Sequence, residues 1–575
     1  MIKNVKYIFR MGAALLLFLS CSANAFQFKP FAQPYYDMVD ATFNQNEAFE
    51  TVAFVEKYFR VVGNEGFNKS IYYAADKLKA AGFVLEEEAK PSDRLTYRIE
   101  KRTLDKPTWE PVSGSLKLGS GEELLNLETN RNMIAINSFS TKGEQSFEFV
   151  NVYEGKDIDN YDVEGKVVVG NASARYLFSE CVQKRGAVGV ISYRIPDYNQ
   201  PVKHQNSISF SGIPLDEEKE SFAILLSYDA YNKLLMAEFE EKFELKIDLT
   251  TKIYKSEELT LVAELKGSKA PEERFVFSAH VQEPGANDNA SGVGALTEIA
   301  ASSARLLQSG QIDPERTITY LFGDEIVSTN RYVQEDPERA KGIKWGMSLD
   351  MVGEDTEKTG GTFLIEKMPD PGAIWVRGVE KHSEWGGRPL TKEQLKPHYF
   401  NDLVISQFKA IGSARNWEVN FNPFEGGSDH VPFLRGNIPG LLLWHFTDVF
   451  YHTDRDRIDK VSPQTLDNVG TGALMIALML TENKEQLVDF VLLEASTAAA
   501  IRMTNEVQLS KSAISEGEDK EVQRDIVATW ADYYMNVFET TLDIDPKNKT
   551  AFQKNLQETK DAMITLKNMS LGQLN

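Results

Sequence analysis

Residues 274–292, RFVFSAHVQEPGANDNASG, decide the fold that we expect for this chain. The stretch opens with a short, largely apolar run (RFVFSA) that is typical of a buried strand, and His280 stands at its carboxyl end. From Gly285 to Gly292 the sequence predicts a turn, which runs into an apolar helix that ends before Gly310. A strand, a turn and a helix in this order form one unit of a βαβ sheet.

The same alternation of strand and helix extends over residues 256–485. Three further apolar runs, at 317–322, 343–349 and 441–444, predict strands. Strands that alternate with helices in this way form a sheet with helices on both faces. We therefore predict an α/β fold with a mixed, mostly parallel twisted sheet flanked by helices.

Histidines and carboxylates follow these strands or lie on the loops after them. They are His280, Asp288, Asp324, Glu325, Asp350 and His452. In open α/β sheets, ligands collect outside the carboxyl ends of the strands. Two histidines and three carboxylates can hold two zinc ions if one carboxylate bridges them. A further carboxylate must take the proton from the attacking water, and Asp324, directly before Glu325, is a candidate for this role.

Six short motifs in this region resemble those of the co-catalytic dizinc exopeptidases of clan MH, which include secreted bacterial aminopeptidases and glutamate carboxypeptidases. The motifs are Ser278-Ala279-His280, the segment from Gly285 to Gly292, Gly323-Asp324-Glu325, Asp350-Met351, Ser428-Asp429-His430 and Tyr451-His452-Thr453. Each motif alone is weak, but six in the right order within a βαβ pattern are specific. The resemblance covers about residues 256–485, and helices within 40–85 would complete the same domain.

The resemblance implies two zinc ions per chain and a role for each ligand. His280 and Asp350 would bind one ion. Glu325 and His452 would bind the other, and Asp288 would bridge the two. All five of these residues are present, which argues against a simple loss of metal.

The resemblance also implies that Asp324 is the general base and that His430, in a motif lining the cleft, orients or contacts substrate. Two residues depart from the family's usual pattern. Gln282 stands where the family usually has an aspartate, and a neutral amide can orient an imidazole but cannot raise its basicity as a carboxylate does. Asp324 stands where the family usually has a glutamate, so its side chain is one methylene shorter.

The parts of the chain outside this region differ in character. Residues 26–114 are predicted to be the N-terminal part of the catalytic domain. Residues 115–255 are β-rich and Gly-rich, and their motifs YDVEGKVVV (161–169) and CVQKRGAVGV (181–190) resemble a protease-associated (PA) domain, which in several relatives is inserted and covers the cleft. Residues 486–575 are predicted to be a helical extension, without a recognisable catalytic pattern.

The composition of the chain and its N-terminal segment exclude several classes of protein. The chain has 575 residues and a formal net charge of −22, a poor match for a protein that coats nucleic acid. With two cysteines, it is no disulfide-stapled scaffold. Residues 1–25 are predicted to be a secretory signal cleaved after Ala25, which places the protein in the periplasm or outside the cell. A lipoprotein anchored at Cys21 is the weaker alternative, and no later apolar run is long enough to span a membrane.

We interpret the sequence as a zinc exopeptidase acting on peptides, most simply an aminopeptidase. The acidic pair Glu354-Asp355 would favour the free α-amine of a substrate, whereas Arg377, Lys381 and Arg388 would suit a terminal carboxylate. A carboxypeptidase or dipeptidase therefore stays open. A non-catalytic binding protein on a peptidase fold and cyclisation of N-terminal glutamine are further alternatives. Neither side-chain preference nor oligomeric state follows from the sequence.

Overall fold

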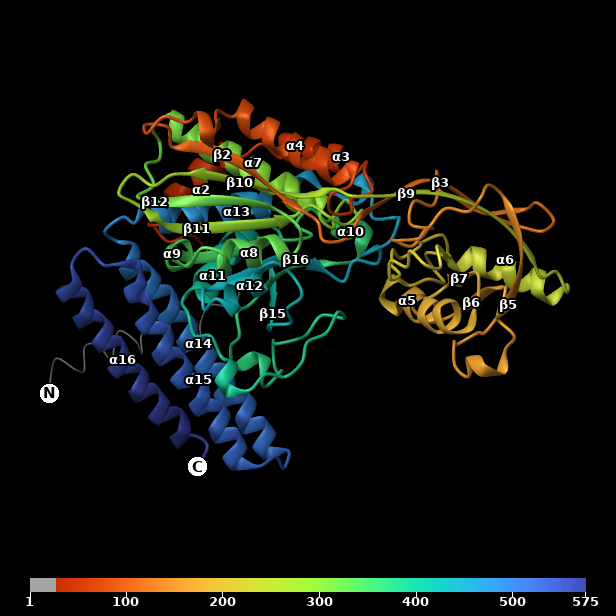
Figure 1. Cartoon of the computed structure of the whole chain (residues 1–575). Coiled ribbons are helices and arrows are strands. Elements are labelled where there is room, and N and C mark those ends of the chain that lie inside the picture. Colours follow the sequence, from red (N-terminus) through yellow and green to blue (C-terminus); the bar gives the residue numbers. More distant parts are fainter. Residues whose placement is uncertain (1–26) are drawn as a thin grey trace.

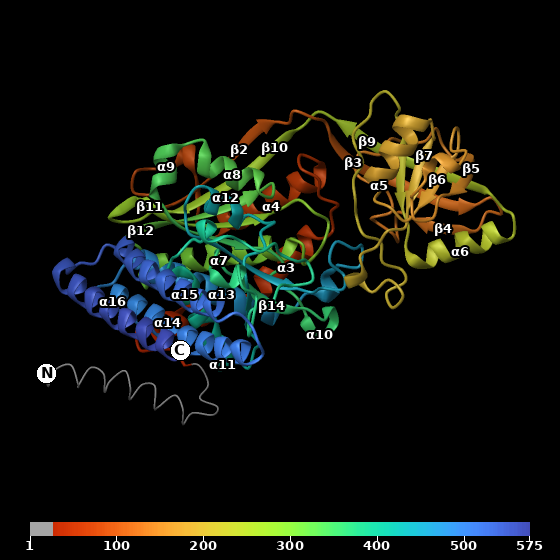
Figure 2. The same cartoon turned by 90° about the horizontal axis from the view of Figure 1, so that it is seen from below.

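The computed structural model describes residues 27–575, so the predicted secretory signal lies outside the described residues. Within them the chain forms a large mixed sheet with helices on both faces, a second smaller sheet, and a set of long C-terminal helices (Figure 1). The second sheet and the C-terminal helices lie at opposite sides of the large sheet in both views (Figure 2).

The large sheet has nine strands in the order β1-β2-β10-β12-β11-β13-β16-β14-β15. Their bounds are Val84–Leu85 (β1), Leu95–Thr103 (β2), Glu257–Leu265 (β10), Ala270–His280 (β11), Arg316–Gly323 (β12), Ile343–Leu349 (β13), Thr362–Glu366 (β14), Asn420–Asn422 (β15) and Gly440–Phe446 (β16). The four central strands β12, β11, β13 and β16 are parallel neighbours, while β10 and β14 run antiparallel to their central neighbours. This confirms the mixed, mostly parallel sheet, and it brings four carboxyl strand ends to one edge.

Both faces of the large sheet are covered. Successive residues of a strand point to opposite sides, so a buried strand sends apolar side chains into both layers. On one face, Phe275 and Phe277 of β11 belong to the main hydrophobic core; on the other, Val276 packs in a smaller cluster. The main core is completed by α2 (Gln33–Asp40), α3 (Gln45–Val55), α4 (Glu65–Ala80), α7 (Ala290–Gln308), α11 (Phe400–Arg415) and α13 (Pro463–Glu482). The smaller cluster includes residues of α8 (Val327–Gln334) and α12 (His430–Arg435).

The second sheet has seven strands in the order β4-β3-β9-β5-β6-β7-β8. Their bounds are Thr108–Leu118 (β3), Glu123–Asn126 (β4), Gln145–Asn151 (β5), Val167–Gly170 (β6), Gly189–Ser192 (β7), Phe222–Leu225 (β8) and Glu244–Tyr254 (β9), with α5 (Ala174–Leu177) and α6 (Tyr228–Phe239) beside them. The long strands β3 and β9 pair from Thr108 with Tyr254 to Leu118 with Leu245 and lead from one sheet to the other (Figure 1). The first strand of the second sheet, β3, begins at Thr108, and the domain boundary at 115 stays a prediction.

The C-terminal part is helical, as predicted. Helices α14 (Leu487–Ser515), α15 (Lys520–Thr540) and α16 (Lys549–Gly572) pack against one another. The buried guanidinium of Arg316, on β12, donates hydrogen bonds to the carbonyl of Leu480 in α13 (3.0 Å) and to the carbonyl of Ile544 between α15 and α16 (2.9 Å), so the second bond ties the C-terminal part to the sheet. Between residues 27 and 575, no helix is long and apolar enough to cross a bilayer.

The close contact of α3 with α7 depends on a glycine and yields a stability prediction. A Cβ atom on Gly294 would lie 2.6 Å from the Ala48 carbonyl oxygen and 2.6 Å from Val52 Cγ2. Because the backbone atom cannot move aside, we expect Gly294→Val to cost about 2 kcal/mol, in the range of overpacked cores, and to lower the melting temperature. Gly572→Val is the control, since no atom of residues 27–575 lies within 4 Å of its Cβ position. Equal melting temperatures for the two variants would contradict this account of the packing.

Candidate dimetal site

The candidate site lies where the parallel strands of the large sheet end. His280 is the last residue of β11 and is only 1% exposed, Asp350 directly follows β13, and Glu325 comes two residues after β12. Asp288 lies on the turn before α7, and His452 lies on the loop after β16. The structure thus gathers residues separated by more than 170 positions at one edge of the sheet, as the strand-end argument predicts.

The first group of possible ligands consists of His280, Glu325 and Asp350, whose ligand atoms all lie within 4.8 Å of one another. His280 Nε2 is 3.2 Å from Asp350 Oδ1, yet neither of these buried atoms has a hydrogen-bond partner among the described residues. The other atoms of these side chains are held. His280 Nδ1 lies 3.2 Å from the Gln282 carbonyl oxygen, and the Ser428 hydroxyl donates to Asp350 Oδ2 (2.8 Å).

The second group consists of Glu283, Asp288 and His452. His452 Nε2 is 3.1 Å from Asp288 Oδ2 and 3.3 Å from Glu283 Oε2. The other oxygen of Asp288, Oδ1, is 3.6 Å from His280 Nε2. Asp288 therefore presents one oxygen to each histidine, which is the placement that a bridging carboxylate requires.

These residues fit a metal centre by their chemistry. Imidazole nitrogens and carboxylate oxygens are zinc ligands, and buried polar atoms without hydrogen bonds are rare unless a ligand or ion satisfies them. Burial and the charge of Glu283 raise the pKa of Asp288 to about 6. Burial alone would lower the pKa of His280, but the carboxylates of Asp350 and Glu325 hold it well above its usual value. A dication would relieve this repulsion, since it stabilises several ionised carboxylates at once.

The turn that carries Asp288 is held by Asp456. Its Oδ1 accepts from the Asn287 amide (2.8 Å) and its Oδ2 from the Asp288 amide (2.9 Å), while its carbonyl oxygen accepts from the Ala286 amide (3.0 Å). Gly285 is required here, because a Cβ atom would collide with the Asp456 carboxylate. Asp456 thus fixes the backbone at Asp288, a role that the sequence motifs alone do not indicate.

The sequence-based grouping of Glu325 with His452 differs from the structure, which places Glu325 beside His280 and Asp350. The side chain of Gln282 explains the difference. Its Oε1 accepts from the Glu325 amide (2.8 Å) and its Nε2 lies 3.4 Å from Glu325 Oε2, so it draws this residue towards the first group. The sequence suggests that the side-chain amide of Gln282 orients the His280 imidazole. In the structure the backbone carbonyl of Gln282 does so instead.

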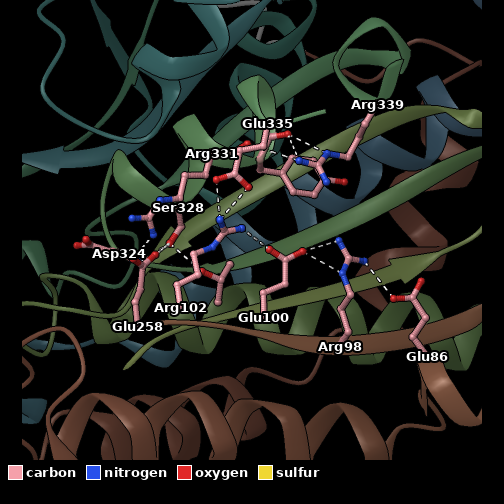
Figure 3. A network of polar contacts seen from close by, with 12 residues as sticks. Glu86, Arg98, Glu100, Arg102, Glu258, Asp324, Ser328, Arg331, Glu335 and Arg339 are labelled. Carbon is pink, nitrogen blue, oxygen red and sulfur yellow. Dashed lines mark hydrogen bonds and ion pairs between the residues drawn. The ribbon is translucent and has the colours of Figure 1, made fainter. Parts of the chain in front are cut away.

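Asp324 lies half-buried next to the first group, at one end of a network of ion pairs (Figure 3). Its amide donates to the Ser328 hydroxyl (2.8 Å), which in turn lies 3.2 Å from Glu258 Oε1. Glu258 pairs with Arg331. Burial, followed by the charges of Glu258 and Asp429, raises the pKa of Asp324 to about 7. A carboxylate with such a pKa can both accept and return a proton near neutral pH.

The resemblance implies that His430 orients or contacts substrate, but the structure buries this side chain. His430 is fully buried, and its Nε2 lies 2.9 Å from Oε1 of Glu366, which also accepts from the amides of Glu425 and Gly426. Its neighbour Asp429 faces the site instead, where its Oδ1 accepts from the Ile326 amide (2.6 Å) and holds the loop after β12. A motif read from sequence cannot tell which of two adjacent residues faces inwards.

The cations considered for a substrate carboxylate are partly engaged elsewhere. Arg377 donates to Glu506 and to Gln523 Oε1 (2.6 Å), residues of the C-terminal helices α14 and α15. Lys381 and Arg388 are exposed. Glu354, expected to make the cleft acidic, is fully buried and accepts a hydrogen bond from the Thr359 hydroxyl (2.6 Å).

The segment between β7 and β8 contacts the loop that carries His452. The Phe210 amide donates to the His452 carbonyl (2.9 Å), and the two rings lie 4.6 Å apart. The Ile208 amide donates to Asp454 Oδ1 (2.9 Å), and Asn199 Nδ2 donates to the Tyr451 carbonyl (3.0 Å). The segment between β7 and β8 therefore supports the loop that carries His452.

Residues 260–477 match the model of peptidase family M28. Aminopeptidase YwaD of Bacillus subtilis (strain 168) is 22% identical over 324 residues, which are 52% of this chain and 64% of that protein. The match thus spans less than two thirds of the curated relative.

Solved structures share the fold. BSAP, a zinc aminopeptidase from Bacillus subtilis, superposes with a TM-score of 0.53 at 17% identity, covering 77% of this chain and 96% of that chain. A Peptidase M28 precursor from Shewanella amazonensis SB2B gives a TM-score of 0.52 at 18% identity, covering 78% of this chain and 95% of that chain.

The role of Asp456 can be tested by hydrogen exchange. Asparagine has one acceptor oxygen, so Asp456→Asn can hold only one of the two amides that the carboxylate holds now. We expect the peptide covering residues 285–289 to exchange at least several-fold faster, as measured by mass spectrometry. Asp454→Asn is the matched control in the same loop, because its remaining oxygen still accepts from the Ile208 amide. If both variants leave exchange at 285–289 unchanged, Asp456 does not fix the turn.

Proposed function

We propose that this chain is a zinc exopeptidase that removes N-terminal residues from peptides. The observation that carries the proposal is the convergence of two histidine–carboxylate groups that share Asp288, with Asp324 beside them. The match of residues 260–477 to the model of family M28 and the relative named as an aminopeptidase support it. Because the match spans only part of the curated relative, the activity of the whole chain is part of the proposal.

The proposal assigns two zinc ions to each chain. His280, Glu325 and Asp350 would hold one ion, His452 would contribute to the other, and Asp288 would bridge them. Zinc at this place supplies Lewis acidity, which polarises a peptide carbonyl and acidifies water. The protein contributes the orientation: Ser428 fixes Asp350, and Asp456 fixes Asp288.

Asp324 is proposed as the residue that moves the proton. It takes a proton from the attacking water and returns it to the nitrogen of the leaving amine, which general acid–base catalysis of amide hydrolysis requires. Its position in a partly buried site next to Glu258 and Asp429 supports this role, because the raised pKa lets the carboxylate accept and release a proton.

The choice of the amino end rests on charge. Arg377, which could have bound the terminal carboxylate of a substrate, is engaged by Glu506 and Gln523 of the C-terminal helices, and this supports cleavage at the amino end. The predicted signal at residues 1–25 would deliver the enzyme to the periplasm or the outside of the cell, where peptides are its substrates.

Replacing the proposed base separates catalysis from metal binding. We expect Asp324→Asn to lower kcat by about 10²–10⁴-fold, because an amide cannot accept the proton, while zinc content measured by mass spectrometry stays as in the wild type. Asp324→Glu is the matched variant that keeps a carboxylate, and it should retain more turnover than the asparagine variant. Undiminished turnover of Asp324→Asn would assign the proton transfer to another residue.

Blocked peptides test which end is cleaved. With a free tripeptide, its N-acetylated form and its C-amidated form as substrates, we expect hydrolysis of the free and the amidated forms only. Hydrolysis should stop after chelation and return with added zinc. Cleavage of the N-acetylated form together with rejection of the amide would point to a carboxypeptidase, and no cleavage by a zinc-loaded protein would favour a binding function.

A further inference from the structure

The geometry points to Glu283 as a metal ligand of the second group, a role that the sequence motifs do not assign to it. This inference rests on the proposed function, since it completes the same metal centre. It concerns one residue, three positions after His280, on the loop between β11 and α7.

The first argument is the number of ligands. Glu325 lies with His280 and Asp350, so without Glu283 the second group would contain only Asp288 and His452. A catalytic zinc site usually has three protein ligands and one open position. The Glu283 carboxylate supplies the third, because its Oε2 lies 3.3 Å from His452 Nε2 on the same side as Asp288.

The second argument is that a simple ion pair does not account for the arrangement. His452 Nε2 faces two carboxylate oxygens, at 3.1 and 3.3 Å, and an imidazole nitrogen has one proton to offer. Together the two groups contain four carboxylates, which two dications balance in charge. The histidines then coordinate as neutral imidazoles, as metal binding requires.

The third argument is that the loop is built to present this side chain. Glu283 has a φ of 82°, a left-handed conformation that is uncommon for residues other than glycine. Its amide donates to the Arg60 carbonyl (3.0 Å). The buried guanidinium of Arg60 donates to the carbonyls of Val281 and Gly285, both at 2.7 Å, and so clamps the loop on either side of Glu283. Unfavourable backbone conformations that are held in this way tend to occur at functional sites.

The same loop sends two adjacent side chains to different ends of the centre. Gln282 contacts Glu325 in the first group, while Glu283 contacts His452 in the second. The side-chain amide of Gln282 thus keeps Glu325 beside His280. The carboxylate of Glu283 occupies the position beside His452 that the resemblance gives to Glu325.

Zinc binding by variants of the full-length chain tests this inference. The wild type should hold two zinc ions after dialysis against a weak chelator. We expect Glu283→Gln, which has the same shape without the charge, to hold one, with the affinity of the second site reduced at least 100-fold in chelator competition. Glu283→Asp, which keeps the carboxylate, should restore part of that affinity. Circular dichroism and the melting temperature of the metal-free proteins serve as controls for folding.

Cobalt substitution assigns the lost ion. Glu325→Gln should weaken the site at His280, and Glu283→Gln the site at His452, so the double variant should bind less cobalt than either single variant. Two tightly bound zinc ions in Glu283→Gln would overturn the inference. If that result comes with aminopeptidase activity, the proposed function stands and only the role of Glu283 fails. A wild type that binds no zinc would overturn both.

Discussion

Six ionisable side chains meet in a largely buried space at the carboxyl edge of the large sheet, and the rest of the structure depends on how their charges are balanced. Four of them are carboxylates, and ionised carboxylates repel one another strongly when they are buried away from solvent. Protons or cations must therefore compensate them. The facing pair His280 Nε2 and Asp350 Oδ1, buried without hydrogen bonds, indicates cations as the natural solution.

Three parts of the structure hold these side chains in place. The parallel strands β11, β12 and β13 aim their ends at one place. Asp456 and Arg60 hold the loop between β11 and α7 through its backbone amides and carbonyls. Phe210, in the segment between β7 and β8, packs against His452, so the position of His452 depends on a part of the chain outside the residues that match the M28 model.

Much of this could be predicted from sequence, because strand ends in an α/β sheet lie together whatever the side chains. That logic placed His280, Asp350 and Glu325 at one edge, and the structure agrees. It could not assign Glu325 to one histidine or the other, since that choice depends on the contact with Gln282. Glu283 was missed because a carboxylate before a Pro-Gly turn looks like an ordinary loop residue. The burial of His430 and the capture of Arg377 by helices over 120 residues away depend on tertiary packing.

The most direct measurement is a crystal structure of the zinc-loaded chain with anomalous scattering recorded at the zinc absorption edge. The account predicts two anomalous peaks at this edge of the sheet, one beside His280 and one beside His452, with Asp288 between them. A single peak, or peaks elsewhere on the chain, would contradict it.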